Sequence, residues 1–244
     1  MWINADLGEG CAHDEALFAI VDWANIACGG HAGDQASMRK ACELALEHGV
    51  QPGAHPSYPD RAGFGRTKPN TDMTSLLDEL LRQMDCFENI AAKTGCTTAH
   101  FKPHGQLYND AAFDKACAML LIEVAKCYPH LKLLALAGSP QVELSRNAGI
   151  VVVEEAFPDR AYLSSGALAP RSQPGAMIDN PEKVRAQAVS IIRQGPLECL
   201  GGSNLVVRAQ TLCVHGDTEQ ALANAKAVRQ ALIEHDQDTF SGAD

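Results

Sequence analysis

The sequence lacks the short motifs that mark several common kinds of site. Neither glycine-rich phosphate loop, G-x-G-x-x-G or G-x-x-x-x-G-K-[ST], occurs in the 244 residues, which excludes the usual nucleotide-binding loops. The G-x-S-x-G elbow of serine hydrolases is also absent, so Ser57 and Cys28 are only fallback nucleophiles. Any active site must therefore be assembled from residues that lie apart in the sequence.

Paired cysteine motifs and long apolar runs are missing as well. The nine cysteines include no C-x-x-C pair, which argues against a disulfide framework or a zinc ribbon. No apolar run reaches the roughly 18 residues of a membrane span. The N-terminus carries Asp6 and Glu9 instead of the cationic head of a secretory signal. We predict a cytoplasmic protein that does not enter a membrane.

Basic residues are scarce. Twenty Lys and Arg stand against thirty Asp and Glu, giving a net charge of -10. A nucleic-acid-binding protein needs a basic surplus to displace phosphate counterions, so we expect no nucleic-acid partner. The 46% of hydrophobic residues suffices for one sizeable core, and we assign residues 1–244 to a single domain.

Seven strand-like segments alternate with helical ones. The expected strands span residues 2–7, 24–28, 50–54, 98–102, 131–137, 150–156 and 210–214. Caps and apolar spacing predict helices after Asp34, over 73–93, from Asn109, over 140–147, after Asn180 and after Asp217. This alternation predicts parallel strands and an α/β fold. Chain length and the number of units favour a TIM-like (β/α) barrel over an open sheet.

The stretch 54–66, AHPSYPDRAGFGR, is the most informative loop. Pro56 and Pro59 remove backbone donors, and Gly63 and Gly65 disfavour a helix. A buried strand would leave the charged side chains without partners. The stretch is therefore a stiffened loop that carries an imidazole, a phenol, a carboxylate and two guanidinium groups, a composition typical of binding and catalytic loops.

Polar side chains follow six of the predicted strands. They are Asp6, Glu9, Cys28, His31, His55, Lys102, His104, Glu154, Asp159, Arg160, His215 and Asp217. In a parallel barrel all of these positions lie on the C-terminal rim, where active sites form. The long connection 157–179 fits a lid or binding loop at the same rim.

Several of these groups could bind a metal. Imidazole and carboxylate are usual ligands of zinc and other divalent ions, and the candidates are His31, His55, His104, His215, Asp6 and Glu9. The donors come from separate segments, so a divalent metal stays open and we assign no metal ligand. Without a metal, the same groups supply a general base, a general acid and cations for an anionic substrate.

Six motifs in collinear order carry a resemblance to a known family. They read NADLGEG, NIACGGHAGD, GAHPSYPDRAGFGR, KPHGQLYN, FPDRAY and CVHGD, and span residues 4–217. The chain resembles the LamB/YcsF family, whose members are the A component of 5-oxoprolinase. The resemblance implies a seven-stranded TIM-like barrel of the glycoside hydrolase/deacetylase type. It also implies ATP-dependent opening of 5-oxo-L-proline to L-glutamate, together with 5-oxoprolinase subunits B and C.

This resemblance, with the rim residues, gives a set of expected roles. We assign catalysis to Asp6, Glu9, His55, Lys102 and His104, and substrate binding to Asn4, His31, Tyr58, Arg61, Arg66, Arg160 and His215. Lys102 or an arginine would pair with the substrate carboxylate and phosphate. Asp6 or Glu9 would activate water, and His55 or His104 would carry the proton. ATP is the expected cofactor, and the missing phosphate loop suggests that its binding depends on the partners or on an unusual pocket.

Two other functions stay open. A metal-dependent deacetylase or carbohydrate hydrolase on the same barrel would contain tightly bound zinc and act without ATP. A non-catalytic subunit would bind 5-oxoproline and present it to its partners.

Overall fold

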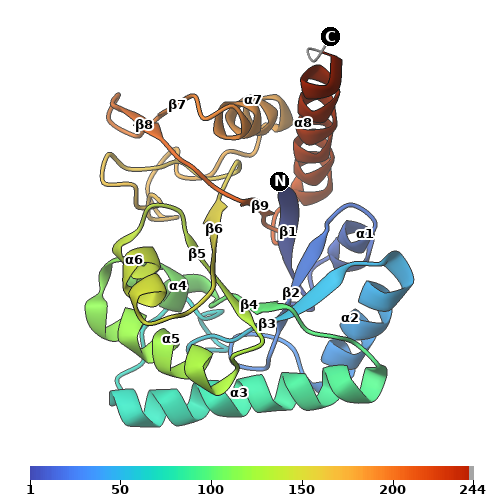
Figure 1. The fold of residues 1–244 in the computed structure, drawn as a ribbon, viewed down its shortest axis with the longest axis vertical. Coiled ribbons are helices and arrows are strands. Elements are labelled where there is room, and N and C mark those ends of the chain that lie inside the picture. Colours follow the sequence, from blue (N-terminus) through green and yellow to red (C-terminus); the bar gives the residue numbers. More distant parts are fainter. Residues whose placement is uncertain (242–244) are drawn as a thin grey trace.

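A closed barrel of parallel strands forms the centre of the molecule (Figure 1). The computed structural model describes residues 1–241. Within them, the barrel strands in spatial order are β1 (Trp2–Leu7), β2 (Trp23–Ala27), β3 (Gln51–His55), β4 (His100–Phe101), β5 (Lys132–Leu136), β6 (Val152–Ala156) and β9 (Thr211–Val214). Each neighbouring pair is parallel, and β9 closes the ring against β1. The predicted seven-stranded α/β barrel is confirmed.

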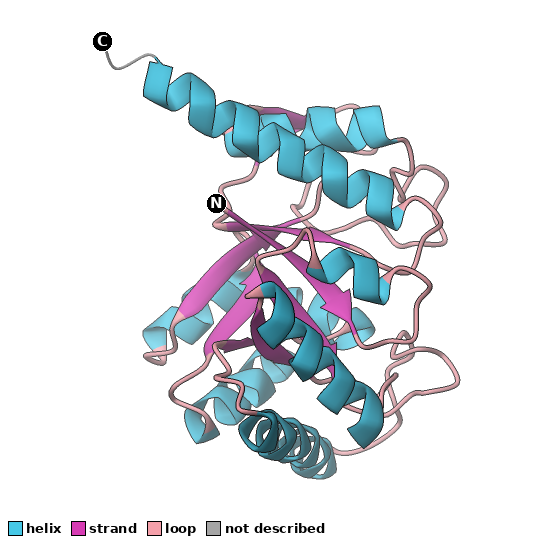
Figure 2. Ribbon diagram, turned by 90° about the vertical axis from the view of Figure 1, so that its right-hand side faces the viewer, coloured by secondary structure: helices cyan, strands magenta, loops and turns pink. Residues whose placement is uncertain are grey.

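Helices surround this barrel (Figure 2). They are α1 (Asp14–Phe18), α2 (Gln35–His48), α3 (Met73–Thr94), α4 (Gly105–Phe113), α5 (Lys115–Cys127), α6 (Pro140–Asn147), α7 (Pro181–Ile192) and α8 (Ala221–Ser241). Helices α7 and α8 pack side by side above the barrel. Beyond α7, β7 (Pro196–Glu198) and β8 (Asn204–Val206) form a small antiparallel hairpin outside the ring.

Polar caps and glycines set the ends of the covering helices. The Asp34 carboxylate accepts two backbone N–H bonds at the start of α2, and Gly49 ends that helix with a φ of 68°. The Asp72 carboxylate accepts a backbone N–H bond at the start of α3, and Gly95 ends that helix with a φ of 85°. Side chains with a Cβ are strained in this left-handed conformation, so glycine terminates both helices at low cost.

Two helix starts differ from the prediction. Helix α4 begins at Gly105, so Asn109 lies inside it and donates to the Gly105 carbonyl. Asp114 caps the next helix, α5. Asp217 is not the cap of α8, because its carboxylate instead accepts hydrogen bonds from two arginines. The short helix α1 and the β7–β8 hairpin were not predicted, because segments this short carry little periodic signal.

Alternation along the strands separates an apolar outer face from a polar interior. On β1, Ile3, Ala5 and Leu7 are fully buried in the main hydrophobic core. Asn4 and Asp6, on the opposite face, point into the barrel and hydrogen-bond to a β2 side chain. Because side chains alternate along a strand, every second residue of these strands is available for an internal polar site.

Aromatic packing fills the N-terminal part of the barrel interior. Trp23, at the start of β2, stacks on His100 with ring centroids 4.6 Å apart. His100 Nε2 also lies 2.9 Å from Asn25 Oδ1, so this imidazole both points inward and is packed. The remaining interior polar groups lie above this layer, toward the C-terminal rim.

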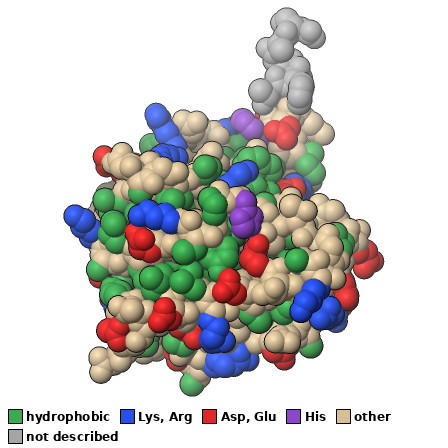
Figure 3. Space-filling view, turned by 60° about the horizontal axis from the view of Figure 1, so that its bottom comes forward, with side chains coloured by type: hydrophobic (Ala, Val, Ile, Leu, Met, Phe, Trp, Pro, Cys, Tyr) green, Lys and Arg blue, Asp and Glu red, His purple; other side chains and the backbone are tan. Residues whose placement is uncertain are grey.

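The surface carries no concentrated charge on the face shown in Figure 3. Acidic and basic side chains are scattered there among apolar ones. Among the described residues, no helix is long and apolar enough to cross a membrane.

Candidate functional site

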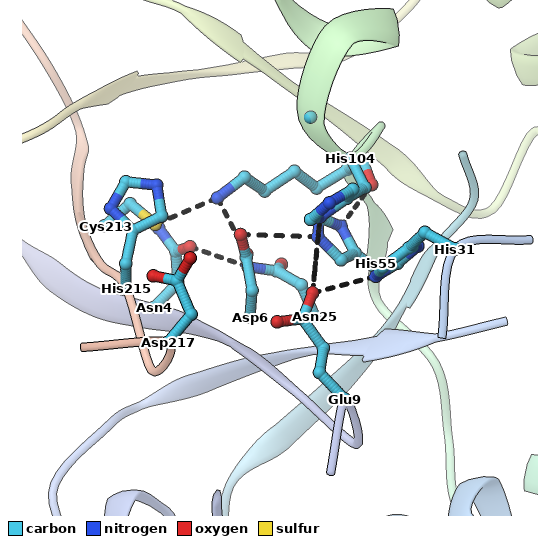
Figure 4. Close-up of polar contacts among 12 residues, drawn as sticks. Asn4, Asp6, Glu9, Asn25, His31, His55, His104, Cys213, His215 and Asp217 are labelled. Atoms are coloured by element: carbon cyan, nitrogen blue, oxygen red, sulfur yellow. Dashed lines mark hydrogen bonds and ion pairs between the residues drawn. The ribbon is translucent and has the colours of Figure 1, made fainter. Parts of the chain in front are cut away.

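A ladder of hydrogen bonds runs through the barrel interior to the C-terminal rim (Figure 4). Asn4 Nδ2 donates to Thr211 Oγ1 at 3.0 Å, and its carbonyl oxygen accepts from Asn25 Nδ2 at 2.7 Å. Asn25 Nδ2 also donates to Asp6 Oδ1 at 2.9 Å. Asp6 receives a further bond of 2.9 Å from Lys102 Nζ. This ladder fixes the Asp6 carboxylate at the mouth of the barrel.

Lys102 is surrounded by anionic and sulfur partners. Its Nζ lies 2.9 Å from Asp6 Oδ1, 3.2 Å from Glu155 Oε1 and 2.9 Å from Cys213 Sγ. Burial by itself lowers the pKa of the Lys102 ammonium, but Asp6, Cys213 and Glu155 together raise it well above its ordinary value. Burial likewise opposes ionisation of Asp6, yet His55 and Lys102 hold the pKa of its carboxyl well below its ordinary value. The two groups form a buried ion pair.

Three imidazoles and one carboxylate gather beside this pair (Figure 4). Glu9 Oε1 lies 2.8 Å from His31 Nε2, 3.2 Å from His104 Nδ1 and 3.9 Å from His55 Nε2. His55 Nε2 is 2.9 Å from His104 Nδ1 and 3.3 Å from Asp6 Oδ2. One donor atom from each of Glu9, His31, His55 and His104 lies within 4.8 Å of all the others, so these side chains could hold a metal ion.

Burial sets the charge of this cluster. It opposes ionisation of Glu9, but the neighbouring His104 and His31 outweigh it and lower the pKa of the carboxyl. Burial lowers the pKa of the His31 imidazole to about 4, and it also lowers the pKa of His104. At neutral pH the cluster therefore contains an ionised carboxylate beside two imidazoles whose burial disfavours protonation.

A tight turn in the loop after β3 holds the histidines in place. Phe64 adopts a φ of 56°, an uncommon conformation for a residue with a side chain, and its carbonyl lies 3.0 Å from His104 Nε2. A Cβ at Gly65 would lie 2.9 Å from both the His104 ring and the His31 side chain. Only glycine allows the backbone to approach these two imidazoles so closely, so the loop packs against one side of them and restricts their positions.

A second acid–imidazole pair lies across the barrel mouth. Asp159 Oδ2 lies 2.8 Å from His215 Nδ1 and accepts from the His215 backbone N–H at 3.0 Å. The Phe157 ring stacks on His215. Burial raises the pKa of Asp159, but His215 outweighs this effect and lowers it. His215 is thus oriented with its other ring nitrogen available.

These groups meet at a cavity of about 620 Å³, a common size for a small-molecule site. Asp6, Lys102, His104 and His215 line its floor, whereas Glu9 and His55 do not reach it. Its rim is formed by residues of the loops after β3 and β6 and of α4, among them Arg66, Gln106, Tyr108, Asn109, Arg160, Leu168, Pro170 and Arg171. The cavity combines an acid–base floor with a cationic rim.

Two of the residues expected to bind substrate lie elsewhere. Tyr58 is fully buried, and its hydroxyl donates to Asp110 Oδ2 at 2.8 Å. Arg61 donates from Nη1 to the carbonyls of Gly29 and Gly33, each at 2.9 Å. Neither side chain lines the cavity. We correct both assignments: Tyr58 packs in the core, and Arg61 holds the loop after β2 in place through its two hydrogen bonds.

The other expected binding residues lie at different depths. Asn4 sits inside the barrel below the cavity, and His31 lies behind Glu9. Arg66 and Arg160 line the cavity; Arg66 Nη2 binds Asp217 Oδ2 at 2.6 Å, and Arg160 donates to the Ala169 carbonyl. These placements leave Arg66 and Arg160 as candidates for direct contact with a ligand.

Sequence reasoning missed two charged residues of the site. Glu155, fully buried against Lys102, was passed over for Glu154, which faces outward and binds Arg146. Side chains alternate between the two faces of a strand, so Glu155 could have been identified once one β6 side chain was known to point into the barrel. Arg171 lies in the long loop 157–179 and binds Asp217 Oδ2 at 2.9 Å; nothing in the sequence distinguishes it from a surface arginine.

Comparison with known proteins places this barrel in a family. A model of the LamB/YcsF family matches residues 1–242. A lactam utilization protein from Thermus thermophilus shares 39% sequence identity and a TM-score of 0.87, covering 96% of each chain. A protein of Enterococcus faecalis described as a candidate cellobiose-phosphate cleavage protein shares only the fold, with 13% identity, a TM-score of 0.54, and coverage of 96% of this chain and 93% of that one. The resemblance seen in the motifs is thus confirmed: the chain belongs to the LamB/YcsF family.

Proposed function

We propose that this chain opens the lactam ring of 5-oxo-L-proline to L-glutamate, coupled to hydrolysis of ATP to ADP and phosphate, as the A component of a 5-oxoprolinase with two further subunits, B and C. Family membership and the lactam utilization protein from Thermus thermophilus support a role in lactam chemistry. The observation that carries the proposal is the buried Asp6–Lys102 pair on the floor of the cavity, because it places an ionised base where a small ring can bind.

The stability of the substrate explains why ATP is needed. An unstrained five-membered lactam is an amide that water attacks very slowly. Phosphorylation of its carbonyl oxygen would create an electrophilic carbon and a good leaving group. Since the sequence has no phosphate loop, we assign nucleotide binding to the assembled complex and the ring-opening step to this cavity.

Among the acids, Asp6 is the better candidate for the base. Asp6 lines the cavity, whereas Glu9 does not. Lys102 and Asn25 both donate to Asp6 Oδ1, which leaves Oδ2 to accept a proton from water. Of the two imidazoles, His104 reaches the cavity, and His55 Nε2 lies behind it, 2.9 Å from His104 Nδ1.

The arginines are better placed than Lys102 to bind the substrate carboxylate. Three groups of this chain already surround the Lys102 ammonium, which has three protons to donate. Arg66 and Arg171 lie at the rim and share a single oxygen of Asp217. A substrate carboxylate could take one of these guanidinium groups from Asp217 with a paired hydrogen-bond geometry.

The test is reconstitution with each component omitted in turn. The chain is mixed with subunits B and C, ATP and 5-oxo-L-proline, and glutamate and ADP are measured. We expect coupled formation of both products only when all three proteins and ATP are present. Undiminished glutamate formation without this chain would refute the proposal.

The histidine cluster favours one alternative, a metal-dependent deacetylase or carbohydrate hydrolase that acts without ATP. Three imidazoles and a carboxylate are ligands that such enzymes use to activate water. Hydrolysis of an acetylated sugar by the isolated chain, without ATP, would favour this alternative. Absence of that activity together with ATP-coupled ring opening would exclude it.

A further inference from the structure

The hydrogen bonds around the histidine cluster determine where its protons lie. His55 Nδ1 is 2.7 Å from the backbone carbonyl of Lys102. A carbonyl can only accept, so this nitrogen carries the proton and the lone pair of a neutral His55 is on Nε2. By the same reasoning, the 3.0 Å contact between His104 Nε2 and the Phe64 carbonyl puts the lone pair of a neutral His104 on Nδ1.

These two lone pairs point at each other. His55 Nε2 and His104 Nδ1 are 2.9 Å apart. Glu9 Oε1 and Asp6 Oδ2, which are also acceptors, lie 3.2 Å from His104 Nδ1 and 3.3 Å from His55 Nε2, respectively. Four acceptor atoms thus converge with no proton between them, an arrangement that repels unless a positive charge lies among them.

Carboxyl groups around this point also outnumber the permanent cations. Asp6, Glu9 and Glu155 carry three negative charges when ionised, and their side chains are 8%, 3% and 0% exposed. Within residues 1–241, Lys102 is the one permanent cation at ion-pair distance from them. Two negative charges remain, and buried charge without compensation is costly. A divalent cation would neutralise them.

The spacing of the donors fits three ligands rather than four. The distances among Glu9 Oε1, His55 Nε2 and His104 Nδ1 are 2.9, 3.2 and 3.9 Å. They bracket the roughly 3.3 Å edge of a tetrahedron built on bonds of about 2.0–2.1 Å to zinc. The His31 ring is parallel to the His104 ring within 1°, with centroids 3.6 Å apart. Lone pairs in two such stacked planes cannot both point at one ion.

We propose that Glu9, His55 and His104 bind one divalent metal ion of the zinc type, with the fourth position open toward Asp6 and the cavity. His31 is then a positioning residue, which donates from Nε2 to Glu9 Oε1 at 2.8 Å and orients the carboxylate. The carbonyls of Phe64 and Lys102 fix the two ligand imidazoles in the same manner.

This site suggests a chemical role that rests on the proposed function. Two imidazoles, a carboxylate and an open position form the ligand pattern of catalytic zinc. An ion there would polarise the lactam carbonyl or lower the pKa of a bound water beside Asp6. Binding of the metal itself does not depend on which lactam, or which amide, is the substrate.

Metal content tests the inference directly. The purified chain is stripped with a chelator and reloaded with Zn²⁺, and bound metal is measured by mass spectrometry after desalting; Co²⁺ loading adds a visible absorption spectrum typical of tetrahedral sites. We expect one ion per chain, a higher midpoint of thermal unfolding on reloading, and no stoichiometric binding by Glu9→Gln or His104→Gln. His31→Gln should still bind one ion, about 10- to 100-fold more weakly.

His130→Gln is the matched control, because His130 is a surface imidazole paired with Glu88 and should bind as the unaltered chain does. A folded, unaltered chain that retains neither Zn²⁺ nor Co²⁺ would refute the site and favour a proton shared between His55 and His104. Loss of binding in a folded His31→Gln chain, equal to that of His104→Gln, would refute the three-ligand assignment. Ring opening at the full rate by a metal-free complex would overturn the chemical role of the metal and leave the proposed function standing. Stoichiometric metal binding by a chain whose complex opens no lactam ring would support the site and overturn the proposed function.

Discussion

Replacing Lys102 by methionine tests whether the site is held together by charge. The Lys102 side chain is 3% exposed, and it contacts Asp6 and Glu155, which are 8% and 0% exposed. Methionine keeps most of the unbranched side chain but removes the ammonium, so both carboxylates lose their buried partner. Breaking a buried pair by removing one member typically costs about 3–5 kcal/mol, and we expect a loss of that size in the free energy of unfolding at pH 7.

The loss should depend on pH with a definite sign. The pKa of Asp6 is held below its ordinary value of 3.8 by His55 and Lys102 against the effect of burial. A lowered acid pKa contributes stability above its ordinary value, and that stability disappears as the pH falls through the folded-state value. Without the ammonium, Asp6 binds a proton more readily. The difference between Lys102→Met and the unaltered chain should therefore shrink between pH 7 and pH 4.

Urea unfolding followed by tryptophan fluorescence measures this difference, because Trp23 is buried in the barrel. Lys126→Met is the control, since Lys126 pairs with Glu123 on the surface and should change stability by about 0–1 kcal/mol. The double variant Lys102→Met with Glu155→Gln should recover part of the loss. A loss below about 0.5 kcal/mol for Lys102→Met, within the range of surface substitutions, would refute the ion-pair account.

Three further predictions concern the cavity and its surroundings. Arg171→Met should raise the KM for 5-oxoproline about tenfold or more while leaving kcat nearly unchanged, because it removes a charged hydrogen bond to the substrate; steady-state kinetics of the reconstituted enzyme would show this, and an unchanged KM would contradict it. Tyr58→Phe should lower the free energy of unfolding by about 1–3 kcal/mol through the lost hydrogen bond to Asp110 without reducing turnover. A large fall in kcat would show that Tyr58 acts in the site. Asp159→Asn should destabilise the chain at pH 7 and progressively less as the pH falls below about 4, because His215 lowers the pKa of Asp159; a pH-independent loss in urea unfolding would contradict this.

The positions of the strands, and with them the rim of the site, could be predicted because both follow from local patterns. Apolar runs that end in glycine, proline or histidine located all seven barrel strands, and parallel strands place their C-terminal ends together. Even β4, reduced to His100–Phe101, was located by the Pro103–Gly105 break that follows it. Asp6, His55, Lys102 and His215 therefore meet at one mouth, as the strand ends indicate.

The contacts of individual side chains could not be read from the sequence. Tyr58 occurs in a loop rich in functional groups, but the loop turns its ring into the core, where Asp110 receives the hydroxyl. Asp217 lies at the distance from Gln220 that is typical of a helix cap, yet its carboxylate forms ion pairs with two arginines from distant loops. Such long-range partners depend on loop paths that no local periodicity encodes.

The proposed metal site illustrates the same limit. The sequence shows which histidines follow which strands, but whether their lone pairs converge depends on the carbonyls of Phe64 and Lys102. Likewise, only the parallel stacking of the two rings distinguishes the proposed ligand, His104, from the positioning residue, His31. These are matters of ring orientation, which the sequence leaves open.

The central claim is that this chain supplies the base for ATP-coupled ring opening, and Asp6→Asn tests it most directly. Asparagine keeps the shape and the bonds to Asn25 and Lys102 but cannot accept a proton. In the complex with subunits B and C, we predict that glutamate formation falls about 100- to 10,000-fold while the complex still assembles. Glutamate formation at the unaltered rate by the Asp6→Asn enzyme would contradict the account.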